Sequence, residues 1–341
     1  MLLAAISGGA DSTAMLVALA SLAPSLGIVV VAAHLDHGLR GKASADDCAH
    51  VQALCERLGV RLVYSRTDSS ARMAARGWSG EAGLRRVRRG FLARAATHVG
   101  AVAISTAHTA DDQLETMLMR LARGAGLTGM GGMRPRHGRW IKPMLAITRE
   151  ALRRDLESVQ IAWREDASNA TRAYLRNRIR LDVVPALLAA LEPTASAAMH
   201  RSRGEALALA GERAAAQLRE ARTALAREAA AALQRSRMGC VGLSLEAGTL
   251  AAHPAAVQRL ALARLWRETG VQERLTERHV SALLRLVCTG GTRSEVLLPQ
   301  GYRAVRQDKV LLLRLQSAGE GPHPTPGRLR TPASESLKVH D

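Results

Sequence analysis

The sequence predicts an α/β protein. Its first part is expected to be a Rossmann-like parallel sheet with helices on both faces, followed by a mainly helical second domain with a small β-hairpin. Three observations lead to this class. Short apolar runs alternate with segments of helical periodicity over residues 2–142, a glycine-rich break follows the first run, and the composition becomes rich in Ala and Arg after Pro193.

Each short apolar run is expected to form a strand, and each periodic segment a helix. The expected strands are residues 2–6, 28–33, 61–65, 101–106 and 139–142. The expected helices are a stretch that ends near Ala23 and residues 46–58, 81–99 and 109–123, the last with Thr109 as its N-cap.

Residues 14–33 carry no charge and are long enough to span a bilayer. However, Pro24 and Gly27 interrupt them and the run IVVVAA follows, so a helix, a turn and a buried strand fit better. A signal peptide begins with basic residues, whereas the first basic residue here is Arg40. We therefore expect a cytoplasmic protein with no membrane partner.

The composition divides the chain into a first domain over residues 1–192, a mainly helical domain over 193–315 and a disordered tail over 316–341. In the second domain, residues 196–235 are expected to form one or two long helices, and residues 296–315 a hairpin. Residues 242–290 are expected to be helical, with breaks at Pro254 and Gly270. The tail is rich in Gly, Pro, Ser and Thr and poor in apolar residues.

The charge balance points to the class of partner. The 341 residues hold 48 Arg and Lys against 30 Asp and Glu, which gives a net charge of +18. An excess of this size favours a polyanion such as nucleic acid. The four cysteines, at positions 48, 55, 240 and 288, form no Cys-x-x-Cys pair, so neither a disulfide framework nor a zinc site is expected.

The glycine-rich break is typical of a phosphate-binding loop. It consists of Ser7, Gly8, Gly9, Ala10, Asp11 and Ser12. Glycines let the backbone approach an anion, and the helix that follows offers unpaired N–H groups. A carboxylate repels phosphate unless a cation joins them, so Asp11 predicts a bridging Mg²⁺, with an N-cap role as the alternative. No Gly-Lys-Ser/Thr follows, so the loop is not the lysine-bearing kind.

Polar residues also follow two other expected strands. Asp36 comes after the second strand, and His108, Asp112 and Glu115 come after the fourth. Ligands bind at the carboxyl ends of strands in open parallel sheets. Asp112 and Glu115 share a helix face, so a metal site, a general base or a cation-binding pocket is compatible with them. A solvated helix start that favours acids is the alternative.

Two further patterns are weaker. Arg176 and Arg180 are one helical turn apart in a basic segment, so they either track a phosphodiester backbone or belong to a solvated helix. Residues 124–129 match G-x-G-x-x-G, but they follow a helix rather than a strand, and no dinucleotide site is expected there.

Taken together, these residues resemble a known family. The stretch SGGADS is similar to the signature of the N-type ATP pyrophosphatases, or PP-loop superfamily, which adenylate an oxygen and release pyrophosphate. Residues 2–190 resemble the tRNA(Ile)-lysidine synthase family, and residues 275–299 more loosely resemble its next domain. The motifs after SGGADS are, in order, HLDHGLR, GEAGLRRVRRGF, TAHTADDQLETMLMRLARGAG, KPMLAITRE and DASNATRAYLRNRIR.

The resemblance implies an adenine nucleotide alpha hydrolase-like fold and a ligase reaction. ATP would adenylate the C2 oxygen of the wobble cytidine of a tRNA(Ile) with a CAU anticodon. The ε-amine of free L-lysine would then displace AMP, so the products are lysidine, AMP and pyrophosphate. ATP and Mg²⁺ are the implied cofactors, and residues 193–315 would bind the tRNA. The oligomeric state stays open, a homodimer included.

The resemblance also implies roles for single residues. Asp112 and Glu115 would hold the lysine ammonium and help to deprotonate it, while Arg85 would stabilise the transferred adenylyl group. Arg89 departs from the family, which usually has Tyr at this position. The implied sites are Arg85, His108, Asp112 and Glu115 for catalysis, Ser7 to Ser12 and Asp36 for ATP, Arg176 and Arg180 for tRNA, and Asp11 for Mg²⁺.

Three other functions stay open at this point. A tRNA thiolase on the same domain would need cysteines near the site, and Cys48 and Cys55 on one helix fit this poorly. The others are a non-catalytic basic RNA-binding protein and a synthetase that adenylates a small molecule.

Overall fold

The chain divides into two compact units. Unit 1 comprises Met1–Leu218 with Pro332–Asp341, and unit 2 comprises Arg219–Thr331. The computed structural model describes residues 1–39, 41–165, 171–191, 197–234, 237–239, 242–289, 294–315 and 338–340. Arg40, Cys240 and most of the expected tail, residues 316–337, therefore lie outside the described residues.

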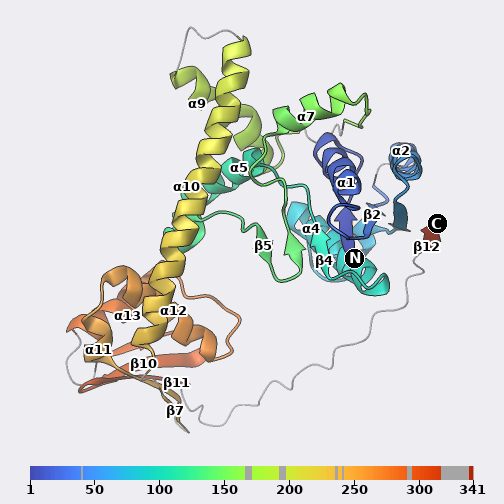
Figure 1. The fold of residues 1–341 in the computed structure, drawn as a ribbon. Helices are drawn as coiled ribbons and strands as arrows, with labels where there is room; N and C mark the ends of the chain where they lie inside the picture. The colour runs from blue at the N-terminus through green and yellow to red at the C-terminus, as the bar shows by residue number, and fades with distance from the viewer. Residues whose placement is uncertain are drawn as a thin grey trace. The chain divides into compact units, whose positions relative to one another are not determined.

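Unit 1 is built on a mostly parallel sheet with the strand order β12-β3-β2-β1-β4-β6-β5 (Figure 1). Strands β3, β2, β1, β4 and β6 run parallel, while β5 and β12 add antiparallel edges. The strands are β1 (Leu2–Ala5), β2 (Val30–Asp36), β3 (Arg61–Arg66), β4 (Ala103–Ser105), β5 (Arg136–His137), β6 (Trp140–Ile141) and β12 (Lys338–His340).

Among the described residues of unit 1, seven helices lie between Ala10 and Ser158. They are α1 (Ala10–Leu22), α2 (Lys42–Leu58), α3 (Ser69–Ala74), α4 (Gly80–His98), α5 (Ala110–Leu121), α6 (Leu127–Met130) and α7 (Arg149–Ser158). Beyond them come α8 (Leu175–Arg178), a π-helical turn (Ile179–Val183), α9 (Val184–Leu191) and α10 (Ala197–Ala232).

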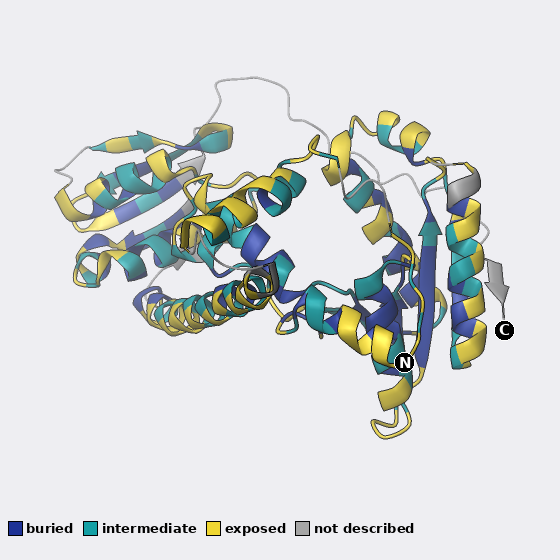
Figure 2. Cartoon of the chain, turned by 90° about the horizontal axis from the view of Figure 1, so that it is seen from above, coloured by how far each residue is buried: buried dark blue, intermediate teal, exposed yellow. Residues whose placement is uncertain are grey.

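Helices cover both faces of this sheet, as the sequence predicts. Successive side chains of a strand point to opposite faces. Leu2 and Ala4 of β1 join a core with α1, α2 and α7, whereas Leu3 joins a second core with Phe91 and Leu92 of α4. The central strands β1, β2 and β4 are largely buried, while the outer helix surfaces are exposed (Figure 2).

The order of the central strands creates a switch point. From β1 the chain moves to β2 and β3 on one side and then returns to β4 on the other side of β1. Loops that leave the carboxyl ends of strands at such a point diverge and form a crevice between them. The segments after β1 and β4 therefore lie next to each other.

Unit 2 combines helices with a five-stranded antiparallel sheet of order β7-β8-β11-β10-β9. Its core includes Leu245, Leu265, Trp266, Leu283 and Leu311. The strands are β7 (Arg237–Gly239), β8 (Gly242–Glu246), β9 (Glu295–Leu297), β10 (Tyr302–Gln307) and β11 (Val310–Leu315). The helices beside the end of α10 are α11 (Ala247–Ala251), α12 (Ala255–Glu268) and α13 (Glu277–Thr289).

Several predicted boundaries differ from the structure. The expected hairpin is part of a larger sheet, because β8 (Gly242–Glu246) forms where the sequence predicts the start of a helix. Residues 338–340 pair with the edge of β3, so this part of the expected tail is a strand. The division between the units falls inside α10 and not at 192/193, because the composition change marks the start of a helix whose first half belongs to unit 1.

The uncharged stretch 14–33 divides as expected into the end of α1, a turn and the start of β2, with Gly27 at φ +60° in the turn. In the parts of the chain that the structure describes, no helix is both long and apolar enough to cross a bilayer.

Candidate functional site

The glycine loop joins β1 to α1 at the switch point. Gly8 has φ +86°, a backbone conformation that favours glycine. The Ser12 hydroxyl braces the loop, because it donates to the Gly9 carbonyl at 3.0 Å and accepts from the Ser7 N–H at 3.1 Å. No side chain caps the first turn of α1, which begins after Gly9. The turn therefore presents its N–H groups and positive dipole end to an anion.

Asp112 is fixed by the start of α5. Thr109 and Asp112 form a capping box, in which the Thr109 N–H donates to Asp112 Oδ2 at 3.0 Å and the Asp112 N–H donates to Thr109 Oγ1 at 3.3 Å. This confirms the predicted N-cap. Since Oδ2 is occupied by the cap, Oδ1 of Asp112 is the oxygen that faces the site.

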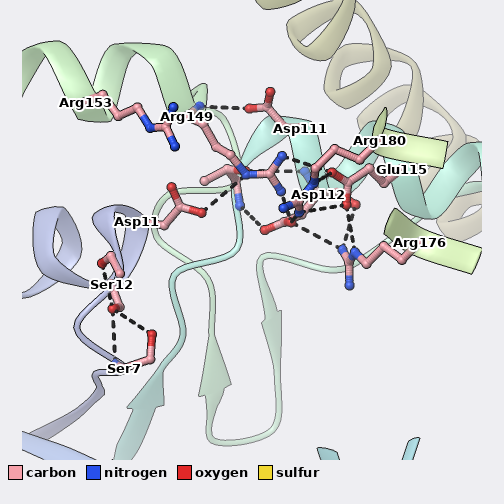
Figure 3. A network of polar contacts seen from close by, with 12 residues as sticks. Ser7, Asp11, Ser12, Asp111, Asp112, Glu115, Arg149, Arg153, Arg176 and Arg180 are labelled. Atoms are coloured by element: carbon pink, nitrogen blue, oxygen red, sulfur yellow. Dashed lines mark hydrogen bonds and ion pairs between the residues drawn. The ribbon is translucent and has the colours of Figure 1, made fainter. Parts of the chain in front are cut away.

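Arg149, the first residue of α7, contacts both the glycine loop and α5 (Figure 3). Its Nε lies 3.4 Å from Asp11 Oδ2, its Nη1 donates to Glu115 Oε1 at 2.9 Å, and its Nη2 pairs with Asp112 Oδ1. Its backbone N–H donates to Asp111 Oδ2 at 2.8 Å. One guanidinium thus links the glycine loop to the acidic pair of α5.

Arg176 and Arg180 complete the cluster from the other side (Figure 3). Arg176 Nε and Arg180 Nε each donate to a Glu115 oxygen at 2.7 Å. Their Nη2 atoms lie 3.4 and 3.6 Å from Asp112 Oδ1. Both side chains turn inward to the carboxylates, so in this structure they belong to an ion-pair cluster, and their predicted contact with tRNA stays a prediction. They would reach a phosphate only by exchanging these ion pairs.

The electrostatics of the cluster follow from burial and charge. Burial alone would raise the pKa of Asp112, but Arg149 and Arg176 lower it to about 2. Glu115 has a lowered pKa as well, because Arg149 and Arg180 outweigh its burial. Both carboxylates are thus ionised at neutral pH. With Asp11 and Asp111 the cluster has four carboxylates against three guanidiniums, so one negative charge is in excess.

Asp11 differs from the other acids of the site. Its burial raises its pKa to about 6, Arg149 opposes the rise, and the negative charges of Asp112 and Asp111 add to it. A divalent cation beside Asp11 would relieve this repulsion. Mg²⁺ is commonly held by one or two carboxylates together with substrate phosphates, so the residues present fit such an ion. Among the described residues, no three metal-binding side chains form a cluster of their own.

Two more predicted residues, His108 and Asp36, lie at the carboxyl ends of strands β4 and β2. Burial lowers the pKa of His108 to about 3, and its Nδ1 lies 3.0 Å from Thr106 Oγ1, so the imidazole is neutral. Asp36 ends β2, where its Oδ1 accepts from the Gly38 N–H at 2.8 Å and its Oδ2 lies 3.4 Å from Arg66 Nε. Its carboxylate is thus used to hold the turn after β2.

Sequence reasoning missed Arg149 and the role of Asp111. Arg149 stands in KPMLAITRE, a motif that matched the family, but no chemistry was assigned to it. A usable signal existed, since Thr148 caps α7 and places the next residue at the first turn of a helix. Which carboxylates that residue meets depends on how α7 lies against α1 and α5.

A mostly parallel sheet with a glycine loop at its switch point defines a phosphate-binding α/β domain. Residues 1–187 match the PP-loop domain, a family named for ATP binding. Because the match covers more than half of the chain, the chain belongs to the PP-loop domain family.

Three curated relatives carry the name tRNA(Ile)-lysidine synthase. The protein from Thermus thermophilus is 39% identical over 315 residues, which cover 92% of this chain and 56% of the relative. The one from Treponema pallidum (strain Nichols) is 41% identical over 197 residues, 56% of this chain and 41% of the relative. The one from Deinococcus radiodurans is 45% identical over 186 residues, which cover 54% of this chain and 31% of the relative. The chain thus spans about half or less of the length of these relatives.

Solved structures are more distant. A U34-tRNA thiolase, NcsA from Methanococcus maripaludis, is 16% identical with a TM-score of 0.46, covering 62% of this chain and 70% of its own. The NH3-dependent NAD synthetase from Campylobacter jejuni is 15% identical with a TM-score of 0.35. The match covers 63% of this chain and 83% of the synthetase chain. Both likenesses are too distant to bear on function.

Proposed function

We propose that this protein ligates free L-lysine to C2 of the wobble cytidine of a tRNA(Ile) with a CAU anticodon. ATP adenylates the C2 oxygen, and pyrophosphate leaves. The lysine ε-amine then forms a bond to C2 while the C2–O bond breaks and AMP leaves. The name shared by the curated relatives supports this reaction, as does a net charge of +18 that suits a polyanionic substrate.

The observation that carries the proposal is the link through Arg149. It places an acidic pair, Asp112 and Glu115, beside the loop expected to hold the ATP phosphates. A ligase of this kind needs a phosphate site and an ammonium site close enough for their ligands to react at one atom. The excess negative charge of the cluster suits one ammonium group.

The low pKa of Asp112 refines its role. A carboxylate with a pKa of about 2 binds an ammonium but is a poor proton acceptor for a group whose pKa is about 10.4. Asp112 and Glu115, both with a lowered pKa, would therefore mainly position the lysine amine, beside the part in its deprotonation that the resemblance implies.

The phosphate side of the site uses the chain's N-terminal loop. The N–H groups at the start of α1 would bind the phosphates of ATP, and Asp11 would hold Mg²⁺. When bound, Mg²⁺ neutralises charge on the phosphates and the leaving pyrophosphate. Arg85, which is close enough to Asp112 for its pKa to respond to it, would stabilise charge on the adenylyl group.

Thiolation on the same domain is less well supported. Burial raises the pKa of Cys48, and it raises the pKa of Cys55 to about 12, so neither thiol is a thiolate at neutral pH.

A cytoplasmic location, tRNA binding by the second domain and a homodimer stay predictions.

The deciding experiment incubates the protein with ATP, radiolabelled lysine and tRNA(Ile) carrying a CAU anticodon. Label in the nucleoside fraction, lost when ATP is omitted, is the expected result. No label beside an active control enzyme would overturn the proposal.

Variants then test the acidic pair. Asp112→Asn and Glu115→Gln should lower lysine incorporation by at least roughly 100-fold while ATP binding changes little. Glu157→Gln, an exposed acid on α7, is the matched control and should remain active. Normal incorporation by both site variants would refute the ammonium site.

A further inference from the structure

A second group of basic residues lies beside the site and has no part in the ion-pair cluster. It lines a pocket between α4, the end of β4 and β6. The lining residues are Arg85, Arg88, Arg89, Leu92, Thr106, His108, Trp140 and Lys142. We call this the α4 pocket.

The α4 pocket has an excess of positive charge, although Glu81 and Asp112 act from a distance on two of its cations, Arg85 and Arg88. Within the described residues, none of its four cations forms an ion pair with a carboxylate. The Lys142 ammonium donates to a neutral group, the carbonyl of Arg134, at 3.3 Å. Burial lowers the pKa of Lys142, and the neighbouring Arg85 and Arg89 lower it further. The cations therefore repel one another and would be stabilised by an anion.

One of the cations is held in place by an aromatic ring. The Arg89 guanidinium lies over Trp140, 4.0 Å from the ring centroid. A stacked arginine keeps its charge and its N–H donors while its plane is fixed, which suits the recognition of phosphate. Arg89 is also exposed, so it can be reached from solution.

The position of the α4 pocket separates it from the ATP loop. α4 covers the face of the sheet that carries Leu3, whereas α1, which follows the glycine loop, covers the other face. A phosphate at the glycine loop would thus lie beside α1, and a phosphate in the α4 pocket beside α4, on opposite faces of the sheet. Arg85 and His108 line the pocket and also belong to the proposed catalytic residues, so its ligand must lie next to the reacting group.

We propose that the α4 pocket binds a phosphodiester group of the RNA chain adjacent to the target nucleotide, with Arg89 and Lys142 as its main contacts. This inference rests on the proposed function, because the target nucleotide is part of an RNA. The contact holds the backbone and reads no base, so it fixes the position of the nucleotide and leaves its identity to other groups.

The test measures RNA binding apart from catalysis. Binding of the tRNA(Ile) transcript to wild-type protein, Arg89→Ala and Lys142→Ala is followed by fluorescence anisotropy between about 50 and 200 mM salt. Loss of one phosphate contact should reduce the slope of log K against log salt by about 0.7 to 0.9. Wild-type protein should therefore lose roughly threefold more affinity than either variant over this range.

Arg86→Ala is the matched control. It removes the same charge from the same helix, but Arg86 lies over Trp78, 5.4 Å from the ring centroid, and not in the α4 pocket. Its slope should stay at the wild-type value, and ATP affinity should be the same in all four proteins. Arg89→Lys, which keeps the charge, should retain most of the slope.

Two results would overturn the inference. One is an Arg89→Ala slope equal to that of Arg86→Ala, and the other is a loss of ATP affinity that parallels the loss of RNA affinity, which would assign the pocket to nucleotide phosphates. If wild-type protein forms lysidine and Arg89→Ala keeps the full slope, this inference alone fails. If wild-type protein neither binds the tRNA nor forms lysidine, the proposed function fails with it.

Discussion

Replacing Arg149 by alanine should destabilise unit 1 strongly. The guanidinium is 18% exposed and contacts three carboxylates at once. Its removal leaves Asp112 and Glu115, which are more deeply buried, with only Arg176 and Arg180 as partners. It also leaves Asp11, whose pKa is already raised, with its main neutralising charge removed.

The size of the effect follows from burial. Breaking a buried ion pair by removing one partner costs about 3–5 kcal/mol, because an uncompensated charge stays behind. For a unit of roughly 150–250 residues each kcal/mol lowers Tm by roughly 2–4 °C. Arg149→Ala should thus lower Tm by about 6–20 °C, and Arg149→Lys by less, because its charge remains but its fork of donors does not.

Thermal unfolding at pH 7, followed by circular dichroism, measures this shift. Arg153→Ala is the control from the same helix, since its ion pair with Glu165 is exposed, 44% and 68%, and should contribute at most about 1 kcal/mol. If Arg149→Ala melts within about 2 °C of Arg153→Ala, the cluster does not stabilise the unit and the reasoning is refuted.

Three further predictions concern pH and the backbone. The pKa of Asp112 falls from 3.8 to about 2 in the folded protein, so its stabilisation is complete above pH 3.8 and is lost as pH falls toward 2. Urea titrations should show that Asp112→Asn removes roughly 2 kcal/mol of this acid dependence; an unchanged dependence contradicts the assignment. The pKa of Asp11 is raised to about 6, so the ionised form opposes folding as pH rises through 6. Asp11→Asn should therefore raise the free energy of unfolding at pH 7 by roughly 3 kcal/mol while it weakens MgATP binding, and a destabilised variant would count against a site shaped for a cation. Gly38→Ala should cost at least about 1 kcal/mol more than Gly59→Ala, because both glycines have positive φ but only at Gly38 would the new Cβ meet a backbone oxygen, that of Thr67, at 2.8 Å. Equal melting temperatures of the two glycine variants would contradict this prediction, because they would show that the turn after Asp36 adjusts to the added Cβ.

The central strands were predictable because each contains a short apolar run that is buried in the sheet. Leu2–Ala5 and Arg61–Arg66 end within one residue of the predicted runs 2–6 and 61–65, whereas Val30–Asp36 is shifted by two to three residues from the predicted 28–33. Burial between two helix layers selects apolar sequence, which makes such runs visible. Short edge strands carry no such signal. Lys338–His340 and Arg136–His137 are held by pairing with a neighbour, which composition does not reveal.

The candidate site was predictable where its chemistry is local. The capping box of Thr109 and Asp112 spans three residues, and the shared face of Asp112 and Glu115 follows from helical spacing. Arg176 and Arg180, four residues apart, are also about one helical turn from each other, but their spacing left open what their face meets, and in the structure both side chains pair with Glu115. A helix alone does not determine whether its basic side faces solvent or a buried carboxylate.

The sequence by itself determined the class of domain, the phosphate loop and the residues that carry charge. These depend on periodicity, on glycine and on residue type, which act within a few positions. Only the tertiary structure decided that Arg149 joins Asp11 to Asp112 and Glu115, although 138 residues separate Arg149 from Asp11. The same holds for the basic α4 pocket, whose cations come from α4 and from the segment after β6. Electrostatic interactions depend on distance in space, and that distance exists only once the sheet has brought the ends of its strands together.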